Sequence, residues 1–303
     1  MFDLLLIVLP VFLILCAGFI GQKFIGFDIR SISMVAIYLL SPFLVFRTFY
    51  ENELTMDYVY IMLFCLVLCF GLIFFIWMIG SIMGATRQKK SGMVLGSVFM
   101  NSGNYGTPIV LFAFGTIGFD YAVIMMVFQS FLMNTVGLFF ASIGSKEETS
   151  LKEAVRRVVR MPVLHGAILG VLFQLFSVEL AKPFTDAIDL VANASIPTFM
   201  LVLGMQLAEI TRKRVDYRSV SIMTVTRMVL SPLFAAVILS FMPINDLLRS
   251  VLIVQAAMPT AVNTTLFALQ FDAEPDLVSF TTFITTLISL ITIPLVLFFV
   301  GVS

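Results

Sequence analysis

The sequence predicts an all-α polytopic membrane protein with ten transmembrane helices arranged as a 5+5 inverted repeat. The chain has 303 residues, of which 60% are hydrophobic and only 12% are charged, with a mean hydropathy of +1.08. A soluble domain of this size could not bury so much apolar surface. Apolar runs of membrane-spanning length recur along the whole chain. Two of them are interrupted by Pro, Gly and Asn at matching places in the two halves, which is typical of secondary transporters.

The apolar runs define the spans in chain order. We predict them at 4–22, 31–50, 57–84, 92–116, 119–143, 161–178, 183–210, 217–241, 247–271 and 275–302. The first run has no basic segment before it and fits no cleavage site, so we expect a helix of the mature protein rather than a signal peptide. The third and seventh runs are long, which indicates tilt or extension beyond the bilayer.

Basic residues define the orientation. With the N-terminus outside, 14 of the 18 Lys and Arg residues fall in inner loops, three lie on the outer side and Arg227 lies inside a span. This asymmetry is a positive-inside signal, and it places both termini outside a plasma (inner) membrane. The basic groups flank helices and form no separate basic domain, so we expect no nucleic-acid partner.

The two halves are related by an offset of 155 residues. This alignment places Asn104 opposite Pro259 and Pro108 opposite Asn263. Because each half holds five spans, an odd number, the second half must enter the membrane in the opposite orientation. We therefore predict a first repeat at 1–148, a cytoplasmic linker at 149–160 and a second repeat at 161–303. The linker region is charged and amphipathic, and we interpret it as a solvated interfacial helix rather than a regulatory element.

The interrupted segments read NSGNYGTP at 101–108 and PTAVN at 259–263. In hydrocarbon each unpaired backbone group costs several kcal/mol, so a break must face protein, water or a ligand. The half-helices beyond the breaks begin near the midplane, and their N-termini carry partial positive charge. We therefore predict an anion site between the breaks. The predicted substrate-binding residues are Asn101, Ser102, Asn104, Pro108, Pro259, Asn263, Thr264, Gln129 and Arg227.

Two alternatives stay open at the level of the residues. Arg227 could neutralise a carboxylate substrate or cap carbonyls freed at a break, or it could only snorkel or pair with a scaffold carbonyl. Gln129, Asn134 and Gln255 could line the pathway or only form hydrogen bonds between helices.

Several function classes are disfavoured. We find no Asp or Glu at the predicted midplanes of spans three to five and eight to ten, which argues against a carboxylate-based cation exchanger. Cys16, Cys65 and Cys69 show no metal spacing, so we predict no metal and no cofactor. An intramembrane enzyme is disfavoured because the chain lacks a GxGD motif and a Ser/His pair on facing helices.

The chain resembles the auxin efflux carrier family, which includes bacterial permeases and plant auxin carriers. The resemblance rests on four segments: NSGNYGTPIVL at 101–111, SIPTFMLVLGMQL at 195–207, RMVLSP at 227–232 and AMPTAVNTTLFALQFDAEPDLVS at 257–279. It implies that Asn101 takes the place of the Asn used in the fourth span of plant members, and Pro259 that of a ninth-span crossover Pro. Asn263 stands where plant members have a second Pro, and span three lacks a membrane-embedded acid.

The resemblance also implies a fold and a mechanism. Spans four and nine would be broken crossover helices, as in the bile-acid symporter and sodium–proton antiporter fold. Helices 1, 2, 6 and 7 would form a scaffold, often dimeric, against which helices 3–5 and 8–10 move as an elevator. We therefore expect a homodimeric permease for a small organic acid anion. A sodium-coupled anion symporter and a ligand sensor that does not transport are the alternatives.

Overall fold

The computed structural model describes residues 2–143, 156, 158–210 and 215–302, so most of the predicted linker at 149–160 lies outside the described residues. Within these ranges every element is a helix, apart from one isolated bridge. The first half contains α1 (Phe2–Ile25), α2 (Ile29–Val35), η1 (Ala36–Leu40), α3 (Ser41–Glu51), α4 (Met56–Ile82), α5 (Arg87–Val98), η2 (Ser102–Gly106), α6 (Thr107–Leu132), η3 (Met133–Gly137) and α7 (Leu138–Ile143). The second contains α9 (Pro162–Leu175), α10 (Lys182–Glu209), α11 (Tyr217–Val225), η4 (Thr226–Leu230), α12 (Ser231–Ser240), α13 (Asp246–Ala256), α14 (Asn263–Gln270) and α15 (Pro275–Phe299).

Seven helices in the described part of the chain are long and apolar enough to cross a membrane. They are Leu6–Ile25, Ile29–Glu51, Met56–Ile82, Ser102–Ile143, Lys182–Glu209, Tyr217–Ser240 and Pro275–Phe299. The helix at Pro162–Leu175 is apolar but shorter. Large apolar side chains such as Phe74, which is 72% exposed, cover the outer faces of these helices. Such surfaces are stable in lipid and not in water, so the chain is a multi-pass membrane protein.

The difference between seven helices and the ten predicted spans has local causes. Ser102–Ile143 is 42 residues long, which is about 63 Å of helix or twice the hydrocarbon thickness. It is interrupted at Gly115, whose φ of 69° and ψ of −162° are not helical. The predicted boundary between the spans 92–116 and 119–143 falls just after this glycine. The predicted span 247–271 is divided into α13 and α14 by the non-helical segment 257–262.

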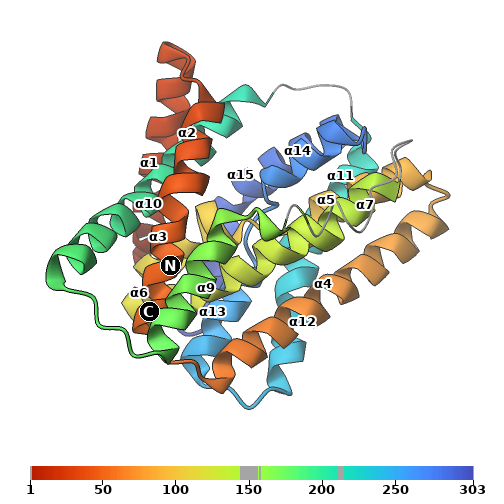
Figure 1. The fold of residues 1–303 in the computed structure, drawn as a ribbon. Coiled ribbons are helices and arrows are strands. Elements are labelled where there is room, and N and C mark those ends of the chain that lie inside the picture. The colour runs from red at the N-terminus through yellow and green to blue at the C-terminus, as the bar shows by residue number, and fades with distance from the viewer. Residues whose placement is uncertain (1, 144–155, 157, 211–214, 303) are drawn as a thin grey trace.

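Two helix pairs form one side of the molecule. α1 packs along α10 and α3 packs along α9, and Figure 1 shows α1, α3 and α10 gathered on one side with α4 and α12 on the other. Glycines allow the backbones to touch: a Cβ at Gly18 would lie 2.2 Å from the Leu201 carbonyl oxygen, and one at Gly204 would lie 2.0 Å from that of Leu15. Close backbone approach through small residues is the usual basis of helix association in membranes.

Gly18→Val should destabilise the protein because its side chain would overlap the backbone of α10. Overpacking of this kind costs about 1–3 kcal/mol. The midpoint of thermal unfolding in detergent should fall clearly below that of the wild type. Ala17→Val, one residue earlier on an exposed face, is the matched control and should unfold like the wild type. Equal midpoints for the two variants would show that the contact between α1 and α10 is not tight.

Candidate functional site

The two broken segments pair with each other. α5 ends at Val98 and α13 ends at Ala256. The chain is extended at Phe99, whereas a turn follows α13 before the chain leaves the helical conformation. The Asn101 N–H donates to the Pro259 carbonyl oxygen at 2.8 Å, and the Ala261 N–H donates to the Phe99 oxygen at 2.9 Å. Met100 and Thr260 thereby form an antiparallel bridge. We call the non-helical stretches 99–101 and 257–262 the crossing segments. They supply each other with the backbone partners that hydrocarbon cannot supply.

Local side chains complete this pairing. The segment η2 is a π-helix, in which the Gly106 N–H donates to the Asn101 oxygen and the Thr107 N–H donates to the Ser102 oxygen. The next bond in this pattern would come from Pro108, which has no N–H. The Thr107 hydroxyl donates to the Gly103 oxygen at 2.6 Å instead. Pro108 thus ends the π-helix without leaving this carbonyl unpaired.

Arg227 lies against the ends of both half-helices. Its side chain is fully buried in η4, and Nη1 donates to the carbonyl oxygens of Ser97 at 3.2 Å and Val98 at 2.8 Å. Its Nη2 donates to the Ala256 carbonyl oxygen and to the Ser231 hydroxyl. The Ser231 hydroxyl also donates to the Ala256 oxygen, at 2.8 Å. Of the readings left open by the sequence, the structure therefore shows Arg227 capping the carbonyls at the breaks.

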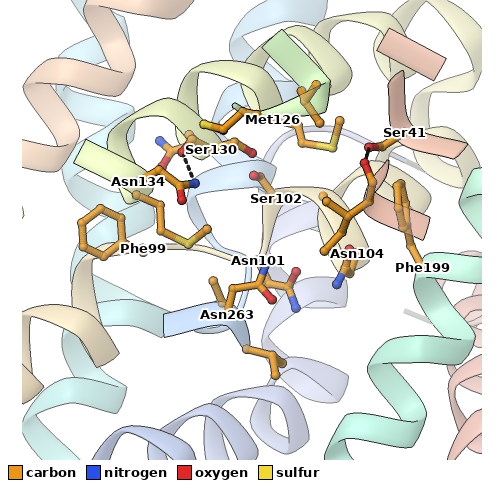
Figure 2. Close-up of a pocket in the computed structure, with 18 of the residues that line it drawn as sticks. Ser41, Phe99, Asn101, Ser102, Asn104, Met126, Ser130, Asn134, Phe199 and Asn263 are labelled. Atoms are coloured by element: carbon orange, nitrogen blue, oxygen red, sulfur yellow. Dashed lines mark hydrogen bonds between the residues drawn. The ribbon is translucent and has the colours of Figure 1, made fainter. Parts of the chain in front are cut away.

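A cavity of about 510 Å³ lies beside the crossing segments. Figure 2 shows Asn101, Ser102 and Asn263 near its centre, with Asn104 toward Phe199. The polar and charged lining residues are Tyr38, Ser41, Asn101, Ser102, Asn104, Gln129, Ser130, Asn134, Arg160 and Asn263. None of the described lining residues is an Asp or a Glu, and Arg160 alone among them carries a full charge. The cavity wall is therefore largely apolar with a set of uncharged polar groups, and the one full charge among its described lining residues is positive.

Asn101 supplies the most distinctive group in the cavity wall. Only 5% of this residue is exposed, and its Nδ2 has no hydrogen-bond partner among the described residues. By contrast, the Asn134 amide donates to the Ser130 carbonyl oxygen at 2.9 Å (Figure 2). A buried donor without a partner costs about 1–3 kcal/mol. An ordered water or a ligand that accepts the hydrogen bond would remove this cost.

The predicted site residues divide into two groups. Asn101, Ser102, Asn104, Gln129 and Asn263 line the cavity together. Pro108, Pro259, Thr264 and Arg227 do not line it and instead contact the backbone of the breaks. The structure also places Asn101, rather than Asn104, beside Pro259.

Sequence reasoning missed part of the cavity wall. Ser41 and Phe199 come from α3 and α10, and Arg160 immediately precedes α9. These residues carry no local signal because only packing brings them to the crossing segments. The π-helical segments were also missed: η1, η2 and η3 each contribute lining residues, and η4 carries Arg227. π-helical turns are rare and often mark functional sites.

Known proteins provide an independent comparison. Residues 4–297 match the model of the family described as "Membrane transport protein". An uncharacterized transporter of Methanothermobacter thermautotrophicus is 27% identical over 97% of this chain and 95% of its own length. An uncharacterized transporter of Methanocaldococcus jannaschii is 24% identical over 88% of each chain. A protein of Rhizobium meliloti, provisionally named a malonate transporter, is 25% identical over 95% of this chain and 92% of its own.

The family match covers nearly the whole chain, and all three relatives carry the names of transporters. The chain is therefore a membrane transporter and not an enzyme. It belongs to the membrane transport protein family, that of the auxin efflux carriers.

Proposed function

We propose that this protein is a secondary transporter, a permease that moves a small organic acid anion across the plasma (inner) membrane. The observation that carries the proposal is the buried Asn101 Nδ2. Among the described residues this donor has no partner, and none of the described residues that line the same cavity is an Asp or a Glu. A carboxylate oxygen accepts hydrogen bonds and would satisfy this donor. A cation would have to approach the donor and the nearby Arg160 without any lining carboxylate to bind it.

The helix ends beside the cavity favour the same class of substrate. η2, which continues into α6, begins at Ser102, and α14 begins at Asn263. The first N–H groups of a helix have no intrahelical partner, and a helix N-terminus carries about half a positive charge. Ser102 and Asn263 stand at such starts, although the Thr264 and Thr265 N–H groups of α14 donate to the Ala261 and Val262 oxygens. A bound anion would therefore meet the Asn101 and Asn263 side-chain amides together with the first N–H groups of η2.

Malonate is the first ligand to test because the relative from Rhizobium meliloti carries a malonate transporter's name. The cavity volume of about 510 Å³ lies within the usual range for small-molecule sites, about 300–1,000 Å³. It is larger than a three-carbon dicarboxylate needs. A panel of malonate, malate, lactate, indole acids and uncharged compounds therefore covers the size range.

We further propose the ten-span inverted repeat that the sequence predicts and the elevator motion that the family resemblance implies. The pairs α1–α10 and α3–α9 support it, because exchanging the two five-span halves converts one pair into the other. The cavity supports it as well: Ser41, Val163 and Phe199 belong to the proposed scaffold, whereas Asn101 and Asn263 belong to the proposed moving unit. A substrate at such a boundary would be carried when one unit slides along the other.

In this proposal the described conformation faces inward and both termini lie outside. Arg160, which lines the cavity, precedes α9 on the side where the basic loops gather.

Uptake measured with and without sodium distinguishes a sodium-coupled symporter from the proposed carrier. Malonate binding without any flux would identify a sensor instead.

Asn101→Ala should reduce malonate uptake into proteoliposomes to a small fraction of the wild-type rate at concentrations below the wild-type KM. Hydrogen bonds to charged groups contribute about 1.5–3 kcal/mol, so binding should weaken by about 10- to 150-fold. Uptake of labelled malonate and thermal stabilisation by malonate measure the two effects.

Asn193→Ala is the matched control for this experiment, because it removes an amide of the same size outside the cavity. The Asn193 side chain accepts a hydrogen bond from Arg47 Nη1. Uptake should persist in this variant. Unchanged uptake by Asn101→Ala would exclude Asn101 from the substrate site.

Arg160→Gln should raise the apparent KM for malonate at low ionic strength and have little effect at high ionic strength. Arg160 is exposed at the cavity wall, so it attracts an anion over a distance that salt screens. Arg156→Gln removes an exposed charge from the same segment outside the cavity and serves as the control. An equal change in both variants would mean that only overall charge matters.

A further inference from the structure

We infer that Arg227 is the positioning residue of the crossing segments: it does not bind the substrate but holds both half-helix ends so that Asn101 and α14 face the cavity. Arg227 is fully buried and is not among the residues that line the cavity. The inference goes beyond the proposed function and rests on it only for the ligand that is used to measure binding.

The Arg227 guanidinium donates hydrogen bonds to the ends of α5 and α13 through separate nitrogens. Nη1 contacts the last carbonyl groups of α5, at Ser97 and Val98, and Nη2 contacts the last carbonyl group of α13, at Ala256. The planar guanidinium holds its donors at fixed angles. The relative position of the two helix ends is therefore tied to one rigid group on a third helix.

The partial negative charges of two helix ends stabilise the buried Arg227 in place of a carboxylate. Among the described residues no Asp or Glu forms an ion pair with Arg227. Each helix C-terminus carries about half a negative charge, so two ends supply about one unit opposite the guanidinium. With the C-termini neutralised, the partial positive charges at the starts of η2 and α14 are left to act on the cavity. Arg227 thus favours an anion without contacting it.

A short series of backbone groups connects Arg227 to the Asn101 side chain. Val98 is followed by Phe99, whose oxygen accepts from the Ala261 N–H, and then by Asn101, whose N–H donates to Pro259. Ala256 precedes Pro259 and Ala261 on the other segment. A shift of either helix end therefore moves the paired backbone and the Asn101 side chain with it.

The experiment measures amide hydrogen exchange and malonate binding on the full chain in lipid nanodiscs. The variants are Arg227→Met, Arg227→Lys and Ser231→Ala, which removes a hydroxyl bonded to both Arg227 and the Ala256 oxygen. Exchange in peptides covering 99–106 and 257–263 should rise at least about tenfold in Arg227→Met and less in the other two variants. Malonate affinity should fall in the same order. Exchange where α1 meets α10 should not change.

Three results would overturn the inference. Lost affinity in Arg227→Met with unchanged exchange in the crossing segments would show that the guanidinium acts on the substrate directly. An equal rise in exchange throughout the chain would show a general loss of stability. Wild-type affinity in Arg227→Met would show that positioning does not need this residue.

The design separates this inference from the proposed function. If the wild type binds no malonate, the proposed ligand is wrong, and the exchange data without ligand still decide the role of Arg227. If Arg227→Met cannot be purified, Arg227→Lys and Ser231→Ala decide it. Wild-type exchange in both of these variants overturns the inference.

Discussion

The absence of water in the bilayer core is the constraint on which this structure depends. A helix that stops within hydrocarbon exposes carbonyl and N–H groups that must find partners inside the protein. Here the two interrupted helices solve the problem jointly. Phe99–Asn101 and Pro259–Ala261 exchange two backbone hydrogen bonds, and the Thr260 hydroxyl donates to the Gly96 carbonyl oxygen at 2.6 Å. Neither break would be satisfied without the other.

This solution separates acceptors from donors across the crossing point. The carbonyl ends of α5 and α13 point to Arg227, whereas the starts of η2 and α14 border the cavity. The side with available donors is therefore the side that is open to a ligand. The same arrangement that allows two helices to end there creates the surface on which we propose that an anion binds.

The sequence allowed much of this site to be predicted. Asn, Gly and Pro are conspicuous in apolar runs because they disrupt helices, so both breaks could be located, and Asn101 and Asn263 do line the cavity. The pairing of the breaks could not be predicted, because a gapless offset of 155 residues assumes equal lengths. The non-helical segments occupy 99–101 in the first half and 257–262 in the second, so Asn101 takes the place expected for Asn104.

Other features depended on tertiary packing. Thr264, a predicted substrate-binding residue, does not line the cavity, and its hydroxyl donates to the Ala261 carbonyl oxygen at 2.7 Å; its binding role stays a prediction. A threonine near a helix start has both options, and the sequence does not distinguish them. Arg160 belongs to a charged segment, and its sequence is equally consistent with a position that faces only solvent. Only the packing of α9 against α3, η1 and α6 brings it to the cavity.

The π-helical turns have a consequence for how cavities of this kind diversify. Each of them holds one residue more than an α-helical turn, so side chains beyond it are rotated by about 100° from where an uninterrupted helix would put them. Removing one residue from η3, the turn that holds the lining residue Asn134, would restore an α-helix. Every later side chain of that span would then point in a new direction. Insertion or deletion of a single codon could therefore replace part of the cavity wall in one step. Gradual exchange of side chains is not the only route to a new substrate in this architecture.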